Sequence, residues 1–192
     1  MSPNEKKMYL GKRIMILGSA GSGKSTLATK LGEITKIPVI HLDRLFWNPG
    51  WIQTPKDEME QKVIEAASGE SWIIDGNYLS TLEFRMERAD SIIFIDYNRY
   101  FCIYRIFKRL IKNHGRTRYD LGEGCIEKID WDFFMWVWNY PKRFRKNTLE
   151  KIYSSGKAVY HLKTRKEVNM LISEAENTLD KKALSFTYSS KI

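Results

Sequence analysis

The 192-residue sequence contains only two cysteines, Cys102 and Cys125, and it has no long apolar run. Two cysteines are too few for a disulfide framework and match no metal-ligand spacing, so we expect reduced thiols. The apolar runs, such as residues 92–95, are far shorter than the roughly 18 residues that a membrane-spanning helix needs. The first ten residues lack the apolar stretch and small-residue cleavage site of a secretory signal. These absences predict a cytoplasmic protein with no membrane segment.

Length and composition describe a globular chain with a positive charge. Low-complexity tracts and internal repeats are absent, so we expect one domain over residues 1–180 and a frayed polar tail at 181–192. Lys and Arg number 32 against 23 Asp and Glu, a net charge of +9. Residues 99–151 hold thirteen basic and six acidic side chains, so most of the excess lies there. Such a region attracts polyanions, either nucleotide phosphates or a nucleic-acid backbone, and charge alone does not choose between them.

Short apolar runs alternate with helix-like segments, as in a parallel sheet covered by helices on both faces. The runs are nearly continuous Ile, Val and Phe, which is typical of strands buried on both faces. The predicted strands span residues 13–17, 39–42, 72–75, 91–96 and 158–162. The predicted helices span residues 24–32, 56–67, 99–113, 131–154 and 166–179. We therefore predict a three-layer α/β fold with a five-stranded parallel sheet.

The strongest functional signal is Gly-Ser-Ala-Gly-Ser-Gly-Lys-Ser at 18–25, a complete G-x-x-x-x-G-K-S phosphate-binding loop. A predicted strand leads into it and a helix follows, the context that the motif requires. Glycines let successive backbone N–H groups point at phosphate oxygens, and the helix start adds unpaired N–H groups. Lys24 is expected to reach the β- and γ-phosphates, and Ser25 to ligate Mg²⁺. The predicted nucleotide-binding residues of the loop are Gly18, Ser19, Ala20, Gly21, Ser22, Gly23, Lys24, Ser25 and Thr26.

Three acidic residues stand at the carboxyl ends of predicted strands, where ligands collect in open parallel sheets. Asp75 is expected to hold Mg²⁺ through water, and Asp43 to orient an acceptor group or take its proton. Each acid could instead cap a helix or a turn. We favour that structural role only for the third, Asp96.

Arginines suited to the charge that develops in phosphoryl transfer follow the fourth strand. Arg105 and Arg109 are spaced i, i+4 and therefore lie on one face of the predicted helix 99–113. Beyond this helix, Gly115 suits a hinge that would let Arg116 and Arg118 close over a nucleotide as a lid. The alternative is a basic, solvent-exposed helix face without a ligand.

Six aromatic residues between positions 131 and 140 precede the basic segment 142–146. Rings interleaved with positive charge can stack bases and hold a nucleic-acid backbone. We favour a core helix instead, because Trp131, Phe134 and Trp138 keep helical spacing. No catalytic part is assigned to the isolated histidines His41, His114 and His161.

The loop and four other motifs resemble known proteins. The form G-x-x-G-x-G-K-S-T at 18–26 is similar to the loop of adenylate-kinase-like P-loop kinases, a group that includes shikimate and gluconate kinases. Nearly the whole chain, from about residue 13 to residue 168, resembles bacterial DNA topology modulation proteins (FlaR-related). The motifs of this second resemblance are His-Leu-Asp-Arg-Leu-Phe-Trp at 41–47, Trp-Ile-Ile-Asp-Gly-Asn-Tyr at 72–78, Gly-Arg-Thr-Arg at 115–118 and Gly-Glu-Gly-Cys at 122–125.

The resemblance implies a P-loop NTPase fold with sheet order 2-3-1-4-5, an ATP site on the loop and a small mobile lid at about 114–127. It also implies that Arg105 and Arg109 match the arginine pair that opens the lid of adenylate kinase. The resemblance also implies that Thr164 and Arg165, which follow the last predicted strand, lie in the loop that contacts adenine. The lid segment contains only one cysteine, which argues against a zinc lid.

The acceptor segment departs from the resemblance. Adenylate kinase follows its Asp-Gly with an aromatic residue, a proline and an arginine, whereas Asp75 and Gly76 are followed here by Asn-Tyr-Leu. A monophosphate would therefore have to be held by Arg44 or Arg85, or the acceptor is not a nucleotide.

Together these features predict an ATP- and Mg²⁺-dependent phosphotransferase acting on a small acceptor, either a nucleoside monophosphate or a hydroxylated metabolite. Lys24 and the loop amides would hold ATP, Ser25 and Asp75 would place the metal, and Asp43 would activate the acceptor. The alternative is a nucleotide-binding regulator that contacts DNA through residues 99–151. The oligomeric state is left open.

Overall fold

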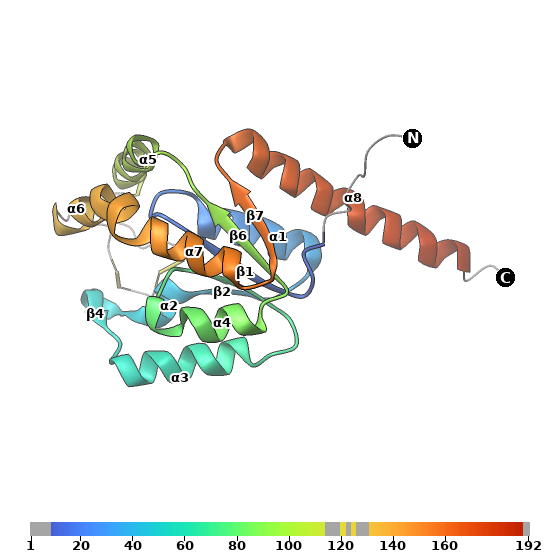
Figure 1. Ribbon diagram of the computed structural model, residues 1–192, viewed down its shortest axis with the longest axis horizontal. Helices are drawn as coiled ribbons and strands as arrows, with labels where there is room; N and C mark the ends of the chain where they lie inside the picture. Colours follow the sequence, from blue (N-terminus) through green and yellow to red (C-terminus); the bar gives the residue numbers. More distant parts are fainter. Residues whose placement is uncertain (1–8, 114–119, 122–123, 126–130, 190–192) are drawn as a thin grey trace.

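The computed structural model describes residues 9–113, 120–121, 124–125 and 131–189, with side chains described up to Thr178. Its elements form three layers, a parallel sheet with helices on both faces (Figure 1). The five strands of this sheet are β1 (Arg13–Gly18), β2 (Val39–His41), β5 (Trp72–Asp75), β6 (Ser91–Ile95) and β7 (Ala158–Leu162). They lie in the order β2-β5-β1-β6-β7, and every neighbouring pair is parallel. The predicted fold and the order 2-3-1-4-5 are confirmed.

The strands are apolar along their length because both faces of the sheet are covered. Met15 and Leu17 of β1 enter one core cluster, whereas Ile14 and Ile16 enter another. Side chains alternate across a strand, so sequence neighbours enter opposite layers. All four of these side chains are fully buried.

Helices supply the outer side of each cluster. The first cluster contains residues of α3 (Lys56–Ala67), α4 (Leu82–Arg88) and α7 (Lys146–Ser154), and the second contains residues of α1 (Lys24–Thr35) and α8 (Arg165–Ser189). A smaller third cluster joins α5 (Arg99–Lys112) to α6 (Trp131–Tyr140). Figure 1 shows these two helices together at one end of the molecule. No helix in the described ranges is long and apolar enough to cross a membrane.

Two helices differ from their predicted form. The predicted helix 131–154 is continuous but contains a π-helical turn at Pro141–Arg145, between α6 and α7. Proline has no N–H to bond the preceding turn, so the backbone widens there. The last helix, α8, continues to Ser189, beyond the end at residue 179 that was predicted for it. Residues 180–184 contain Lys, Ala and Leu without Gly or Pro, and these favour helix.

A short helix and a hairpin between β2 and α3 were not predicted. Leu42 begins α2 (Leu42–Phe46) instead of ending the second strand. The antiparallel strands β3 (Trp47–Asn48) and β4 (Ile52–Gln53) follow, joined by a turn in which Gly50 has a φ of 76°. This segment forms one side of the candidate site.

Candidate active site

The phosphate-binding loop connects β1 to α1 with a backbone that glycine makes possible. Gly18, Gly21 and Gly23 have φ values of 142°, 75° and 98°. A Cβ added to Gly18 would lie 2.3 Å from the carbonyl oxygen of Ile95, so only glycine fits between the loop and β6. The hydroxyl of Ser22 is buried and has no hydrogen-bond partner among the described residues. The loop therefore leaves donors available for an anion, as a phosphate site requires.

Lys24 and Arg105 bring positive charge to the loop. Lys24 Nζ donates a hydrogen bond to the carbonyl of Ser19 at 3.1 Å. Burial lowers the pKa of Lys24, and the negative charges of Asp43 and Asp75 oppose that shift. Arg105 donates from Nη1 to the carbonyl of Ser22 at 2.9 Å, so α5 is fastened to the loop. Both cations lie where a polyphosphate would need them.

A chain of hydrogen bonds connects the loop to the ends of two strands. The Ser25 hydroxyl donates to Oδ2 of Asp75 at 2.7 Å, and Oδ1 of Asp75 lies 2.5 Å from Nδ1 of His41. Burial alone would lower the pKa of His41, but the hydrogen bond and charge of Asp75 outweigh it and raise that pKa. Asp75 is buried at the end of β5, and His41 ends β2 beside it.

Ser25 and Asp75 fit a magnesium site. Mg²⁺ prefers oxygen ligands and is held in phosphotransferases by one or two protein oxygens, substrate phosphates and water. The Ser25 hydroxyl at the start of α1 and the Asp75 carboxylate at the end of β5 provide such oxygens. No group of three or more His, Cys, Asp or Glu suited to a metal occurs within the described residues, so a fully protein-ligated metal is not found there.

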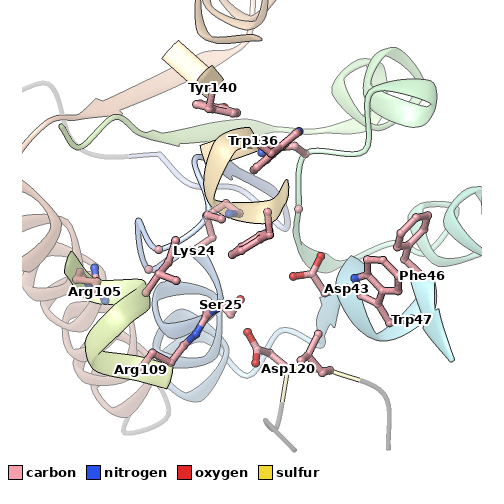
Figure 2. A pocket seen from close by; sticks show the side chains of 18 of the residues that line it. Lys24, Ser25, Asp43, Phe46, Trp47, Arg105, Arg109, Asp120, Trp136 and Tyr140 are labelled. Atoms are coloured by element: carbon pink, nitrogen blue, oxygen red, sulfur yellow. The ribbon is translucent and has the colours of Figure 1, made fainter. Parts of the chain in front are cut away.

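The loop opens onto a cleft of about 1350 Å³. Figure 2 shows Lys24, Ser25, Arg105 and Arg109 on one side of it and Asp43 on the other. Oδ1 of Asp43 accepts a hydrogen bond from the Tyr78 hydroxyl at 3.1 Å. Burial and the neighbouring carboxylate raise the pKa of Tyr78, so this tyrosine stays neutral and holds Asp43 in place.

The structure therefore brings together most of the predicted central residues. Residues of the loop, Asp43 and the two arginines of α5 line the same cleft, and Asp75 lies directly behind Ser25. Lys24, Ser25, Asp43, Asp75, Arg105 and Arg109 come from four segments that are distant in the sequence.

Two predicted acceptor residues lie elsewhere. Arg85 is fully buried, and its guanidinium donates to the carbonyls of Gly76, Asn77 and Tyr78. Its donors are thus committed to the backbone of the segment after β5, and the prediction that Arg85 binds an acceptor does not fit this placement. Arg44 is exposed and is not among the residues that line the cleft.

The predicted adenine-contacting residues stand apart from the cleft as well. Thr164 caps α8, because its hydroxyl accepts from the N–H of Glu167 while its own N–H donates to the Glu167 carboxylate. Neither Thr164 nor Arg165 lines the cleft. The lid arginines Arg116 and Arg118, like most of the predicted lid at 114–127, lie outside the described residues.

Asp96 makes structural contacts, but they are an ion pair and a histidine contact and not the helix or turn cap that we favoured. Its carboxylate accepts two hydrogen bonds from Arg145, at 2.7 and 2.6 Å, and pairs with Nε2 of His161 at 2.7 Å. These contacts tie the end of β6 to β7 and to the π-helical turn.

The sequence analysis missed three features of the cleft. His41 was assigned no part, although it contacts Asp75. Asp120 is 6% exposed and lines the cleft, but no motif marks it in the sequence. The aromatic helix is not simply core: Trp136 and Tyr140 line the cleft, whereas Trp131 is 73% exposed. Helical spacing identified an apolar helix but not which of its faces meets a cavity.

Solved small-molecule kinases have a similar fold. The shikimate kinase of Acinetobacter baumannii, solved in complex with shikimate, has a TM-score of 0.54 and 15% identity over 95% of this chain and 96% of that chain. The shikimate kinase of Bacteroides thetaiotaomicron has a TM-score of 0.52 and 17% identity over 88% of this chain and 98% of that one. A gluconokinase from Sinorhizobium meliloti 1021 has a TM-score of 0.50 and 15% identity over 95% and 99% of the two chains.

At these identities the likeness establishes the fold alone. No protein-family model matches the sequence, and no curated protein matches it. The resemblance to DNA topology modulation proteins is not shown by any of these comparisons and stays a prediction. The chain has the α/β fold of the shikimate kinase and gluconokinase structures, with its own candidate site at the carboxyl ends of the strands.

Proposed function

We propose that this protein transfers the γ-phosphoryl group of ATP to a hydroxyl group of a small acceptor molecule. The observation that carries the proposal is the pairing, across one cleft, of a phosphate-binding loop bearing Lys24 with the carboxylate of Asp43 (Figure 2). A site with a phosphate cradle on one side and a proton acceptor on the other has the two parts that phosphoryl transfer to an alcohol needs. Its fold is that of kinases named for shikimate and gluconate, which supports the same class of reaction.

Positive groups of the chain would hold the phosphates and stabilise the charge that develops on them. The loop amides and Lys24 bind the triphosphate, and Arg105 and Arg109 neutralise charge as the bond between the γ-phosphorus and the leaving ADP breaks. Ser25 and Asp75 would hold Mg²⁺, which, when bound, offsets the negative charge of the phosphates and orients them. Little covalent chemistry is required of the protein, because positioning and electrostatics account for most of the catalysis.

Asp43 would act on the acceptor. Its carboxylate orients the acceptor hydroxyl and takes the proton as the hydroxyl oxygen bonds to the γ-phosphorus. The bond between that phosphorus and the oxygen of the β-phosphate breaks, and ADP leaves. The hydrogen bond from Tyr78 keeps the carboxylate in position for this step.

Of the two acceptor types considered, a hydroxylated metabolite fits the cleft better than a nucleoside monophosphate. A monophosphate needs a guanidinium or ammonium group beside Asp43. Arg85 is committed to backbone carbonyls and Arg44 does not line the cleft. The acceptor side of the described cleft therefore lacks the cation that a monophosphate would need.

The proposal is tested by ADP release from ATP across a panel of hydroxylated metabolites and nucleoside monophosphates. We expect release to rise with at least one acceptor, to be lost in Lys24→Ala, and to be lowered in Asp43→Asn while ATP affinity stays nearly unchanged. Acceptor-dependent release that survives Lys24→Ala would contradict the proposal. If no acceptor works and duplex DNA binds with a steep salt dependence, the regulator hypothesis is favoured instead.

A further inference from the structure

The hairpin beside the cleft holds a tryptophan in a backbone conformation that favours glycine. Asn48 pairs with Ile52, so β3 and β4 are joined by a loop of three residues, 49–51. The last residue of such a loop is left-handed and is ordinarily glycine. Here it is Trp51, with a φ of 64°. A bulky residue in this conformation is strained, and such strain collects at ligand-binding sites. Trp51 also lines the cleft, where its ring can contact a ligand.

The ring of Trp51 begins a connected run of rings that ends at Asp43. Its centroid lies 5.3 Å from that of Trp47, and the Trp47 centroid lies 4.7 Å from that of Phe46. The Phe46 centroid lies 4.8 Å from that of Tyr78, whose hydroxyl donates to Oδ1 of Asp43. We call these four rings the ring wall; each is half-buried and lines the cleft. The ring wall therefore continues directly from the carboxylate that we propose to act on the acceptor hydroxyl.

Helix α6 and the turn after it bring further rings to the cleft. Trp136, Tyr140 and Phe144 line it, and the centroid of Trp136 lies 5.6 Å from that of Tyr140 and 5.8 Å from that of Phe144. In Figure 2, Asp43 has Trp136 on one side and rings of the ring wall on another. A flat ring gains stacked or edge-to-face contacts with aromatic side chains. A polyol would instead set hydroxyl groups against ring faces, which replace few of the hydrogen bonds that those hydroxyls make in water.

We infer that the acceptor carries an aromatic ring next to the hydroxyl that receives the phosphoryl group, and that Trp51 selects for this ring. The hydroxyl lies at Asp43, as in the proposed kinase reaction, and the aromatic ring of the acceptor lies against the ring wall. A nucleoside and a simpler aromatic alcohol share this chemistry. The inference rests on the proposed function and narrows its substrate class.

Four equimolar acceptor panels test the inference: nucleosides, other aromatic alcohols, saturated alcohols of matched size, and polyols. ADP release from ATP is measured for each panel with the full chain and with Lys24→Ala. We expect the highest Lys24-dependent kcat/KM in one of the two aromatic panels, by about tenfold over the saturated alcohols, because stacking on aromatic side chains favours a flat ring. The aromatic panel with the higher value identifies the source of the ring.

The two levels of the proposal fail in different ways. Lys24-dependent release that is highest with saturated alcohols or polyols overturns the aromatic acceptor but leaves the kinase function standing. Absence of Lys24-dependent release with every panel overturns the kinase function, and the aromatic acceptor with it.

Two variants of Trp51 test whether its ring contacts the acceptor. Trp51→Gly removes the ring and places glycine where φ is positive, so the hairpin is expected to fold. Trp51→Phe keeps an aromatic ring at the same backbone position. We expect Trp51→Gly to raise the KM of the best aromatic acceptor about tenfold, with the KM of ATP nearly unchanged. Trp51→Phe should raise the acceptor KM much less.

Urea denaturation of the same variants separates substrate binding from packing. The urea midpoint of Trp51→Gly should not fall below that of Trp51→Phe, because glycine relieves the strained φ. If Trp51→Gly lowers the urea midpoint and leaves the acceptor KM unchanged, the ring of Trp51 only packs the hairpin, and its selective role is overturned.

Discussion

Nδ1 of His41 lies 2.5 Å from Oδ1 of Asp75, on the side opposite the Ser25 hydroxyl, which donates to Oδ2 of the same carboxylate. The histidine therefore fixes the orientation of the carboxylate that faces the loop. His41 is not itself among the described residues that line the cleft. It acts as a positioning residue through Asp75, much as outer partners orient metal-binding groups in general.

Replacing this histidine should weaken the binding of the magnesium complex of a nucleotide. In His41→Gln we expect the affinity for ADP with Mg²⁺ to fall by about tenfold, because Asp75 loses the contact that orients it. The affinity for ADP in the presence of a chelator should change much less. Titration calorimetry under the two conditions measures the difference.

The matched control is His161→Gln, which removes a second histidine–aspartate contact, 2.7 Å from Asp96, outside the cleft. In His161→Gln, the affinity for ADP with Mg²⁺ and the affinity for ADP with a chelator should keep the ratio that they have in the unsubstituted protein. Equal losses with and without Mg²⁺ in His41→Gln would assign His41 to general stability instead.

Arg85 should prove to be a stabilising residue and not a substrate contact. Arg85→Met leaves three carbonyls without their buried donor, and we expect a loss of unfolding free energy of about 3 kcal/mol or more. Urea denaturation measures this. Arg44→Met, at an exposed arginine of α2, serves as the control and should shift stability by less than about 0.5 kcal/mol. A stable Arg85→Met protein with a raised acceptor KM would restore the prediction that Arg85 binds the acceptor.

Gly18 should not tolerate a side chain. Its φ of 142° is unfavourable for other residues, and a Cβ would overlap the carbonyl oxygen of Ile95. We expect Gly18→Ala to lower the unfolding free energy by about 2 kcal/mol or more and to abolish nucleotide binding. In Gly69→Ala the nearest atoms to the new Cβ lie 3.8 Å away, so the change should be small. Similar stability losses in the two variants, from urea denaturation, would show that the loop backbone can relax.

The contacts of Asp96 with Arg145 and His161 should make the free energy of unfolding depend on pH. Burial raises the pKa of Asp96, but the hydrogen bonds and charges of Arg145 and His161 outweigh it and hold that pKa below its usual value. Since the folded pKa is lower than the unfolded value of about 3.9, the stabilisation is complete above that value and is lost as the pH falls through the folded pKa. Asp96→Asn should flatten the decline of the urea midpoint between about pH 5 and pH 3. If the urea midpoint of Asp96→Asn falls as steeply as that of the unsubstituted protein, other carboxylates cause the loss of stability at low pH.

Local patterns predicted the framework of the fold. The near-continuous Ile, Val and Phe runs identified the strands because both of their faces are buried, and Gly18–Thr26 was readable because loop, lysine and helix start are contiguous in the sequence. The short elements between β2 and α3 escaped prediction. α2 has only five residues and β3 and β4 two each, too few for a period to show.

The candidate site was predicted in part. Asp75 was found because it ends a strand, and Asp43 because it follows a predicted strand, and parallel strands gather their carboxyl ends at one edge. Arg44 and Arg85 were proposed because arginine suits an anionic acceptor, but residue type does not reveal where a side chain points. Packing in α4 directs Arg85 into the interior, where backbone carbonyls are its partners.

By itself the sequence determined that this protein has a phosphate-binding loop in a parallel α/β sheet, because those features depend on residues that are neighbours along the chain. Only the tertiary structure decided what surrounds the loop. It placed His41 behind Asp75, brought Asp120 and the rings of α6 to the cleft, and put the cations on one side and the aromatic rings on the other. These relations join segments that are distant in the sequence, since even His41 and Asp75 are 34 residues apart. Side-chain direction across such distances is set by packing, which no local pattern records.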